Sequence, residues 1–174
     1  MIFQPSTDSR HLPVMLMESL ENLNIKNSGI YVDGTLGLGG HSEEILKKID
    51  SGLLLGIDRD NGSIELAKKR LSNYKNFKLF HDSYKNLKNI LFKLDIAGVD
   101  GILLDLGLSS YQLEDNQRGF SHKHSSELDM RFDNNIDSNK ADDIIKKYDL
   151  KSLTKIFRDF GEERNAYRIA KMIK

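Results

Sequence analysis

The sequence contains no cysteine. Disulfide bonds and thiolate metal sites are therefore excluded, and the composition is compatible with a reducing compartment. No apolar run approaches the roughly 20 residues that a membrane-spanning helix needs. Residues 1–6 also lack the basic and then apolar pattern of a secretory signal. We therefore expect a cytoplasmic protein that does not contact a membrane.

Net charge is absent as well, because Lys and Arg total 26 and so do Asp and Glu. The overall charge gives no sign of nucleic-acid binding. The charge is unevenly spread, however, since residues 140–174 carry ten basic and six acidic side chains. This asymmetry is expected of a nucleic-acid-modifying enzyme. A solvated helix face explains it equally well.

Apolar strand and helix patterns alternate through the first 106 residues. Strands are expected at residues 30–32, 53–57, 77–80 and 101–106. Helices are expected at residues 13–23, 42–49, 63–71 and around 87–94, where apolar residues recur every three or four positions. The alternation predicts an α/β fold with a parallel, doubly wound, Rossmann-like sheet.

The sequence changes character after Gly107. Residues 109–138 are polar and without periodicity, and three helices are then expected, at 141–148, at 152–160 and from 162 onwards. No fifth strand is apparent. We therefore predict a cofactor domain over residues 1–108 with strands one to four only. A polar substrate loop and a helical subdomain would follow over residues 109–174.

The stretch from Tyr31 to His41 organises the chain. It predicts the end of a buried strand, a carboxylate at Asp33, a glycine-rich turn and a helix from about Ser42. A glycine turn at a helix N-terminus lets the backbone approach a ligand closely. The carboxylate of Asp33 would repel phosphate but suits a cationic ligand. These residues predict a nucleotide-like cofactor.

The spacing of the glycines bears on which cofactor is bound. The dinucleotide fingerprint needs glycine at the first, third and sixth positions, and Gly37 and Gly39 fit while the sixth residue is Ser42. S-adenosylmethionine methyltransferases have an acid followed by glycines at every second position. Asp33 is followed at those steps by Thr35, Gly37 and Gly39, so one glycine is replaced. A plain tight turn is the third interpretation.

Two further carboxylates follow expected strands. Asp58 lies 19 positions after Gly39, where an acid commonly accepts hydrogen bonds from ribose hydroxyls. The alternative is an ordinary loop aspartate before a turn. Asp105 ends the fourth strand, at the edge where parallel sheets bind ligands. Burying it would require a partner, and a structural cap is the alternative interpretation.

Metal binding and triad chemistry find no support in the sequence. His122 and His124 lie near Glu127 and Asp129, but without a recognised ligand spacing. No Ser-His-Asp or Cys-His arrangement can be argued from the order of residues. We therefore predict no metal site and identify no catalytic residue.

The chain resembles the ribosomal RNA small subunit methyltransferase H family. That family methylates the exocyclic amino group of a cytidine in the decoding region. The matching segments are residues 11–14, 31–42, 56–60, 99–110, 112–113, 118–121, 128–131 and 161–164. They occur in the family's order over almost all of the chain, and residues 105–110 and 118–121 are the most specific.

The resemblance implies S-adenosylmethionine as the cofactor. The cofactor-binding residues that it implies are Gly39, Gly40, His41, Asp58, Tyr84, Asp105 and Gln112. Tyr84 replaces the usual phenylalanine and keeps a ring that can stack on adenine. Other departures are Leu38 for arginine, Tyr111 for proline and Phe132 for methionine. The Tyr111 change bears on the path of the loop toward Gln112.

The resemblance also implies the reaction. The cytidine amino nitrogen would displace the sulfonium methyl group, with Asp105 or a carbonyl just after it accepting a hydrogen bond from the amine. Small-subunit ribosomal RNA is the implied partner. Arg118, Lys123 and Arg131 are candidates for phosphate contacts, and loop solubility is the alternative explanation for these charges.

The family has a seven-stranded sheet with a helical insertion after strand four. This chain supplies sequence for four strands, so we expect it to stop within the insertion and to leave the edge of the fourth strand unpaired. That edge predicts either association, in the simplest case as a homodimer, or marginal stability, together with little or no methyl transfer. Two other functions stay open. A non-catalytic remnant would bind cofactor without turnover, and a nicotinamide-dependent oxidoreductase would need neither Asp33 nor residues 105–110.

Overall fold

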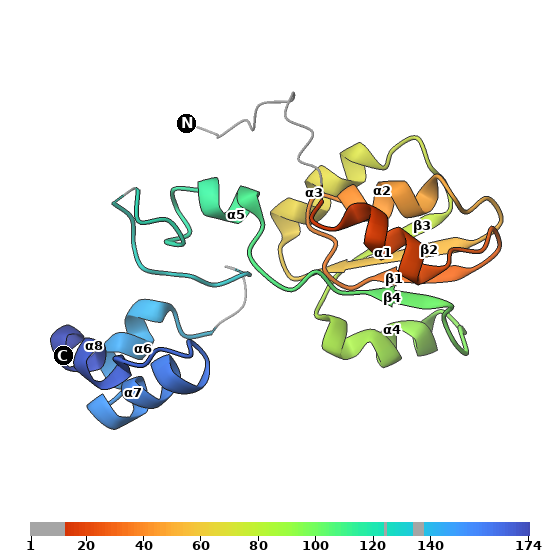
Figure 1. Ribbon diagram of the computed structural model, residues 1–174. Coiled ribbons are helices and arrows are strands. Elements are labelled where there is room, and N and C mark those ends of the chain that lie inside the picture. The colour runs from red at the N-terminus through yellow and green to blue at the C-terminus, as the bar shows by residue number, and fades with distance from the viewer. Residues whose placement is uncertain (1–12, 124, 134–137) are drawn as a thin grey trace. The chain divides into compact units, whose positions relative to one another are not determined.

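The computed structural model describes residues 13–123, 125–133 and 138–174 (Figure 1). The chain divides into two compact units. The first ends at Tyr111, and the second runs from Gln112 to Lys174. No helix within the described ranges is long and apolar enough to cross a bilayer.

The first unit is built on a four-stranded parallel sheet with the order β3-β2-β1-β4. Its strands are β1 Ile30–Asp33, β2 Leu53–Asp58, β3 Phe77–His81 and β4 Gly101–Leu103. Asp33 lies opposite Gly56 on one side and Leu103 on the other. Because all four strands are parallel, their carboxyl ends meet at one edge. The predicted α/β fold is confirmed.

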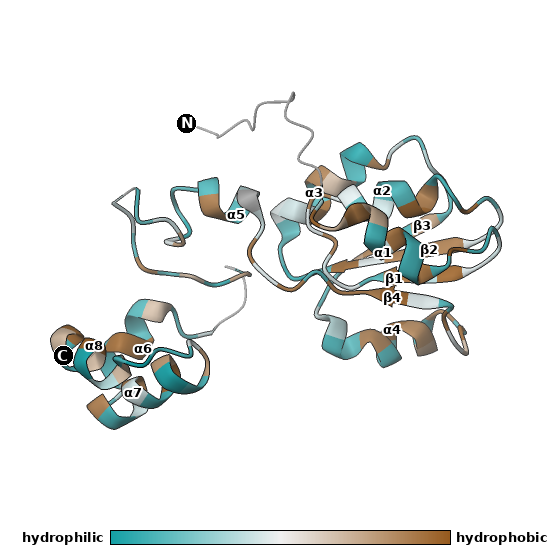
Figure 2. Ribbon diagram, viewed as in Figure 1, coloured by the Kyte–Doolittle hydropathy of each residue, from teal (hydrophilic) through white to brown (hydrophobic). Residues whose placement is uncertain are grey.

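Helices cover both faces of this sheet (Figure 1). They are α1 Leu16–Leu23, α2 Gly40–Leu46, α3 Asn61–Arg70 and α4 Leu87–Lys93. Neighbouring strand residues point to opposite faces. Tyr31 accordingly belongs to the apolar cluster of α1, α2 and α3, whereas Val32 packs with Ile90 of α4. Apolar residues run along β1, β2 and β4 (Figure 2), as a sheet buried on both faces requires.

The fourth strand is shorter than the sequence predicts. β4 ends at Leu103, not at residue 106. Its neighbour β1 ends at Asp33, the partner of Leu103, so Leu104 has no strand to pair with on that side. β4 is one of the two edge strands of this sheet, and Ile102 and Leu104 are exposed.

The first-unit helices differ from the prediction mainly at their ends. α1 begins at Leu16 because Met15 has a left-handed φ of 51°. α2 begins at Gly40, two residues before the predicted Ser42, and ends at Leu46. A short 3₁₀ turn, Tyr84–Asn86, precedes α4. The predicted inward-facing residues, such as Ile45 and Ala67, are buried.

The second unit is helical. Its helices are α6 Ala141–Lys147, α7 Leu150–Asp159 and α8 Ala166–Ile173. α7 and α8 pack together and bury Leu153, Ala166 and Ala170. The three predicted helices are confirmed, but α8 begins four residues late, after Glu162 with its φ of 51°. A further helix, α5 Ser110–Glu114, includes the last two residues of the first unit and was not predicted, because five residues are too few to show a helical period.

Candidate functional site

The glycine-rich turn after β1 is bound to the ends of two neighbouring strands. The backbone N–H of Gly34 donates to the carbonyl oxygen of Leu103 in β4 at 2.9 Å. The N–H of Leu36 donates to the carbonyl oxygen of Ile57 in β2 at 3.0 Å. The turn is therefore held across the carboxyl edge of the sheet, where ligands of open parallel sheets bind.

Asp58 ties the tip of β2 to this turn. Its Oδ2 accepts a 2.7 Å hydrogen bond from the N–H of Gly37, and its Oδ1 accepts one of 2.9 Å from the N–H of Asp60. Burial raises the pKa of the carboxyl group, and these backbone N–H groups oppose the rise. A carboxylate offers about four lone-pair sites. The N–H of Arg59 also bonds this carboxylate, so about one acceptor site remains for a ribose hydroxyl.

Asp33 lies enclosed beneath the turn. It is 1% exposed, and it accepts hydrogen bonds from the hydroxyl of Ser42 at 2.7 Å and the N–H of Thr35 at 3.2 Å. Burial raises its pKa to about 6. Ser42, the residue that breaks the dinucleotide fingerprint, is thus the donor that holds Asp33. The enclosed carboxylate therefore stabilises the turn through Thr35 and Ser42 and is not accessible to a ligand.

Thr35 joins the turn to the end of β4. Its Oγ1 accepts a 2.7 Å hydrogen bond from the backbone N–H of Asp105. This bond explains why threonine stands where the alternating pattern would have a glycine. The side chain of Asp105 is exposed. The cost of burying a charge, which the sequence interpretation considered, therefore does not arise.

The glycines of the turn differ in what surrounds them. Gly37 has a φ of 50°, and a Cβ atom there would meet only the carbonyl oxygen of Thr35, at 3.9 Å. Gly39 has a φ of 76°, and a Cβ atom there would lie 3.2 Å from Cβ of Ala67 in α3. Gly37 thus has an open side, whereas Gly39 allows the turn to pack on α3.

Tyr84 packs beside the start of the turn. A Cβ atom on Gly34 would lie 3.1 Å from Cβ of Tyr84 and 2.6 Å from Cδ2 of Leu104. Only glycine admits the two side chains so close to the backbone. Tyr84 remains 37% exposed. The first unit therefore gathers the turn, Asp58, Tyr84 and the backbone of Asp105 at one edge of the sheet.

A model of the MraW methylase family matches residues 8–174. The chain belongs to this family. It is 49% identical over 164 residues to the ribosomal RNA small subunit methyltransferase H of Halothermothrix orenii, covering 94% of this chain and 52% of that protein. It is 46% identical over 165 residues to the protein of that name from Clostridium botulinum strain Loch Maree, with 94% and 53% covered. The chain spans about half the length of the curated relatives it matches.

Among solved structures, a methylase from Clostridium thermocellum has a similar fold. It is described as a putative rRNA-methylase, and it aligns with a TM-score of 0.50 at 22% identity. The alignment covers 57% of this chain and 55% of that one. Membership in the MraW methylase family confirms the resemblance that the sequence motifs predicted, and the structural match supports the α/β fold.

Of the remaining residues that the family resemblance implies, Gly40 and His41 begin α2 directly after the turn, and Gln112 belongs to the second unit. A Cβ atom on Gly40 would lie 2.5 Å from Cγ of Pro13. His41 is buried, and its Nε2 lies 3.2 Å from the carbonyl oxygen of Val14. Both residues therefore pack against the segment before α1. Gln112 is a buried residue of the second unit.

Sequence reasoning missed Asp82, which follows β3 as Asp58 ends β2. Its N–H donates to the carbonyl oxygen of Asp58 at 2.9 Å. Its Oδ1 accepts from the N–H of Ser83 at 2.7 Å and from Nδ2 of Asn86 at 2.6 Å. An acidic residue two positions after the predicted strand 77–80 was the available signal. Asp82 fixes the turn that carries Tyr84.

Asp60, which the sequence marked only as part of a family motif, has a structural role. It is 1% exposed, and its Oδ1 accepts from the N–H groups of Gly62 at 2.9 Å and Ser63 at 3.4 Å. These bonds cap the N-terminus of α3.

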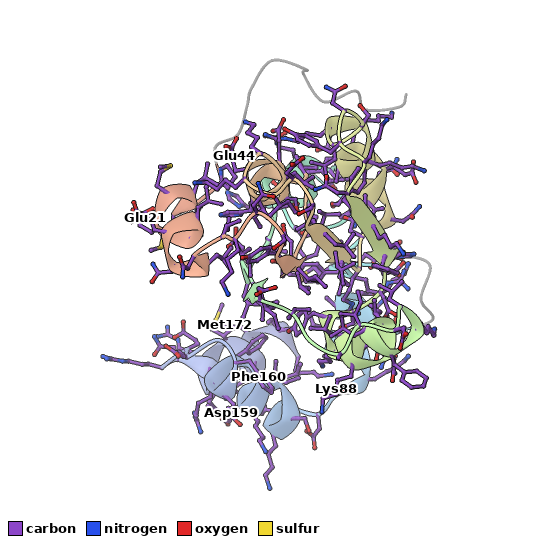
Figure 3. The ribbon with its side chains drawn as sticks, turned by 90° about the vertical axis from the view of Figure 1, so that its right-hand side faces the viewer. Glu21, Glu44, Lys88, Asp159, Phe160 and Met172 are labelled. Carbon is purple, nitrogen blue, oxygen red and sulfur yellow. The ribbon has the colours of Figure 1, made fainter. Side chains whose placement is uncertain are left out.

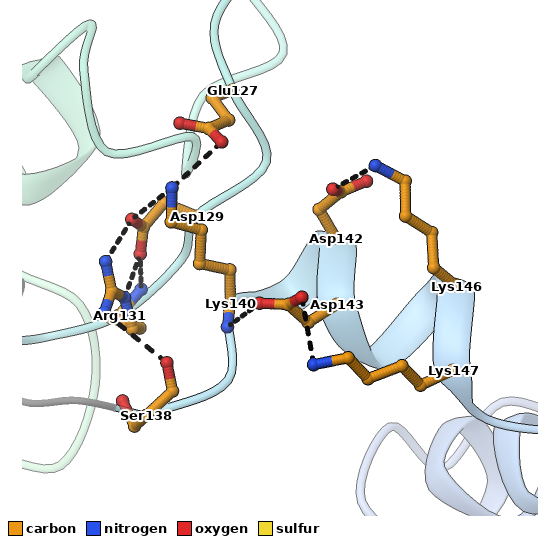
Figure 4. Close-up of polar contacts among 9 residues, drawn as sticks. All are labelled: Glu127, Asp129, Arg131, Ser138, Lys140, Asp142, Asp143, Lys146 and Lys147. Carbon is orange, nitrogen blue, oxygen red and sulfur yellow. Dashed lines mark hydrogen bonds and ion pairs between the residues drawn. The ribbon is translucent and has the colours of Figure 1, made fainter.

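Two of the three proposed phosphate contacts are engaged within the second unit. Nε of Arg118 lies 3.2 Å from Oδ2 of Asp115, and its Nη1 donates to the carbonyl oxygen of Phe132 at 3.0 Å. The guanidinium group of Arg131 donates hydrogen bonds of 2.7 and 2.8 Å to the carboxylate of Asp129 (Figure 4). Both guanidinium groups thus stabilise the loop. The side chain of Lys123 is exposed.

The carboxylates near His122 are likewise paired with cations. Arg131 holds the pKa of Asp129 below its usual value. Nζ of Lys140 lies 2.9 Å from Oε1 of Glu127 and 3.9 Å from Oδ2 of Asp129 (Figure 4). His124 lies outside the described residues. Within the described ranges, no three potential metal ligands come together.

Proposed function

We propose that this chain binds S-adenosylmethionine and contributes to methylating the exocyclic amino group of a cytidine in small-subunit ribosomal RNA. The observation that carries the proposal is the position of the Asp58 carboxylate. The N–H of Gly37 fixes it, and it can still accept a hydrogen bond from a ligand. Family membership supports the same function. The names of the relatives supply the RNA substrate.

The cofactor would be held by residues at the carboxyl edge of the sheet. Asp58 would accept a hydrogen bond from a ribose hydroxyl, as acids after the second strand commonly do. Tyr84 would stack on the adenine ring. The open side of Gly37 leaves the turn free to lie against the ligand. The family resemblance implies further cofactor-binding residues, namely Gly39, Gly40, His41, Asp105 and Gln112.

When bound, S-adenosylmethionine supplies an electrophilic methyl group. The chain must orient a weakly nucleophilic amine and hold its protons. Asp105 is the best candidate, because its carboxylate is exposed while its backbone is fixed by Thr35. The target base would have to be unpaired or flipped out of its stack. The division into a cofactor part at 1–108 and a substrate part at 109–174 belongs to this proposal.

A nicotinamide-dependent oxidoreductase, which transfers hydride, fits this site less well than a methyltransferase does. A dinucleotide site uses a glycine at the position that Ser42 occupies. Here the hydroxyl of Ser42 is engaged by the enclosed carboxylate of Asp33.

Calorimetric titration tests the cofactor. We expect S-adenosylmethionine and S-adenosylhomocysteine to bind and a nicotinamide dinucleotide not to bind. Asp58→Asn should weaken binding by about 1.5–3 kcal/mol, a factor of about ten to a hundred. Asp50→Asn, which changes an exposed carboxylate, is the matched control. Equal affinity of Asp58→Asn and the parent would make the ribose assignment wrong.

Transfer of a radiolabelled methyl group to unmodified small ribosomal subunits tests the activity. Label in the RNA that depends on Asp58 would establish the reaction. Cofactor binding with no label would instead favour a non-catalytic cofactor-binding protein.

Self-association is also part of the proposal. β4 is an edge strand. Ile102 within it and Leu104 and Leu106 directly after it are exposed. Such an edge invites pairing with a second chain. A homodimer is the simplest assembly that would cover it.

A further inference from the structure

The positive surplus of residues 140–174 lies mainly on α7 and α8. The three lysines between residue 140 and the start of α7 are paired with carboxylates. Lys140 lies 2.9 Å from Glu127, and Lys147 lies 3.2 Å from Asp143 (Figure 4). Lys146 is paired with Asp142 in the same way. The charges of α6 therefore largely cancel.

Three basic residues of α7 form what we call the α7 basic stripe. They are Lys151, Lys155 and Arg158, spaced by four and three positions and so on one side of the helix. All three are exposed. Within the described part of the chain, none of them forms an ion pair or a side-chain hydrogen bond. These cations are thus available to a ligand.

The stripe lines an open hollow of about 590 Å³ together with Tyr167 of α8. The other lining residues are Leu150, Thr154 and Asp159. Asp159 is the single acidic residue there, so the hollow carries a net charge of about +2. Figure 3 shows Asp159 and Phe160 where α7 ends.

Tyr167 is held beside the stripe by the packing of α7 on α8. Ala166, next to it, is fully buried, and so is Ala170 one turn later. These small residues let the two helices approach closely. Tyr167 itself is 54% exposed. The hollow therefore combines a row of cations with an accessible aromatic ring.

We propose that the α7 basic stripe and Tyr167 bind single-stranded RNA, the stripe through phosphates and the ring through one stacked base. The three cations extend over about 10 Å of the helix axis. Such a row follows a backbone better than it holds one small anion. Proteins that bind single strands combine basic grooves with stacking aromatics. The inference rests on the proposed RNA substrate. It assigns the phosphate contacts to the α7 basic stripe in place of Arg118 and Arg131, whose guanidinium groups are engaged in the loop.

The test is fluorescence anisotropy of a labelled single-stranded oligouridylate with the whole chain, without cofactor, over a range of salt concentrations. The variant is Lys151→Gln/Lys155→Gln/Arg158→Gln. The control is Lys48→Gln/Lys68→Gln/Lys69→Gln, which removes the same charge from exposed residues of the first unit. For single strands each phosphate contact contributes about 0.7 to the slope of log affinity against log salt. In the stripe variant, the magnitude of this slope should therefore decrease by about two. Its affinity for the oligonucleotide at low salt should fall by about tenfold or more.

Tyr167 has its own variants. Tyr167→Leu should lose about tenfold in affinity with an unchanged salt slope, and Tyr167→Phe should bind as the parent does. Circular dichroism confirms that the helices remain. An unchanged affinity and slope in the stripe variant would overturn the proposal. An equal loss in the lysine control would do so too, because the effect would then be one of net charge.

Titration of cofactor into the same variants separates this inference from the proposed function. The stripe and Tyr167 variants should bind S-adenosylmethionine as the parent does. If the parent binds cofactor but its affinity for RNA does not depend on the stripe residues, the present inference alone is wrong. If stripe-dependent RNA binding persists in a chain that does not bind cofactor, the proposed function is wrong.

Discussion

The backbone N–H of Gly37 donates a 2.7 Å hydrogen bond to Oδ2 of Asp58. This contact joins the turn after β1 to the tip of β2, and so couples the two parts of the sequence that most strongly indicated a cofactor. The same carboxylate is bound on its other oxygen by the N–H of Asp60. Asp58 is therefore fixed in position by the fold itself. A ligand that uses its remaining acceptor site meets a carboxylate that needs little rearrangement.

Substitutions at Gly37 and Gly39 should separate ligand binding from folding. Gly37→Ala places a Cβ atom in open space, and its left-handed φ should cost about 1–2 kcal/mol. Gly39→Val adds contact with Ala67 and should cost about 3 kcal/mol or more. Urea denaturation measures both, and calorimetry should find weakened cofactor binding in the folded Gly37→Ala variant. Similar stability of the two variants would contradict this assignment.

The buried Asp33 should make the stability of the chain depend on pH. Its pKa is about 6 in the folded chain, against an ordinary value of 3.8. Because the folded pKa is the higher one, this contribution is fully present below pH 3.8 and is lost as the pH rises through 6. The loss should amount to about 3 kcal/mol.

Asp33→Asn isolates this effect from the other titrating groups. The amide keeps the shape of the side chain, and the hydroxyl of Ser42 can turn to accept from it. Urea denaturation between pH 3.5 and pH 7 (roughly the interval over which the two pKa values differ) should show the parent losing stability relative to Asp33→Asn. Parallel stability curves for the two proteins would show that the carboxyl group does not titrate as proposed.

Local patterns predicted most of the first unit. The core residues of β1, β2 and α3 follow from apolar periodicity, and Ile45 and Ala67 are buried as expected. The position of Asp58 after the second strand also followed from the spacing. These features depend on near neighbours in the chain or on the shared direction of parallel strands.

The missed features depend on contacts between distant residues. β4 ends early because β1 offers no further partner, which no pattern within residues 101–106 can reveal. The hydroxyl of Thr35 meets the N–H of Asp105, 70 positions away. Arg118 is engaged because its Nη1 donates to the carbonyl oxygen of Phe132, 14 positions away. A sequence shows that such residues are polar, but the fold decides which partner each one has.

Thr35→Val should loosen the end of β4. Valine keeps the shape of the side chain and removes the acceptor of the Asp105 N–H. Amide hydrogen exchange at Asp105 should become faster, while Thr35→Ser should exchange as the parent does. Because the Asp105 backbone lies near solvent, the loss of global stability should stay near 1 kcal/mol. Equal exchange rates in parent and Thr35→Val would show that the hydroxyl does not hold this strand end.

The exposed edge beside β4 should make the chain associate. Ile102 is 49% exposed and Leu104 46% exposed next to an edge strand. A charged side chain at such an edge opposes pairing with another strand. Light scattering at increasing concentration should show a rising average mass for the parent and a constant mass for Ile102→Lys. Phe92→Lys is the control, since Phe92 is 87% exposed and belongs to the helix α4 and not to a strand. A parent that remains monomeric throughout, or a control that behaves like Ile102→Lys, would show that β4 does not drive association.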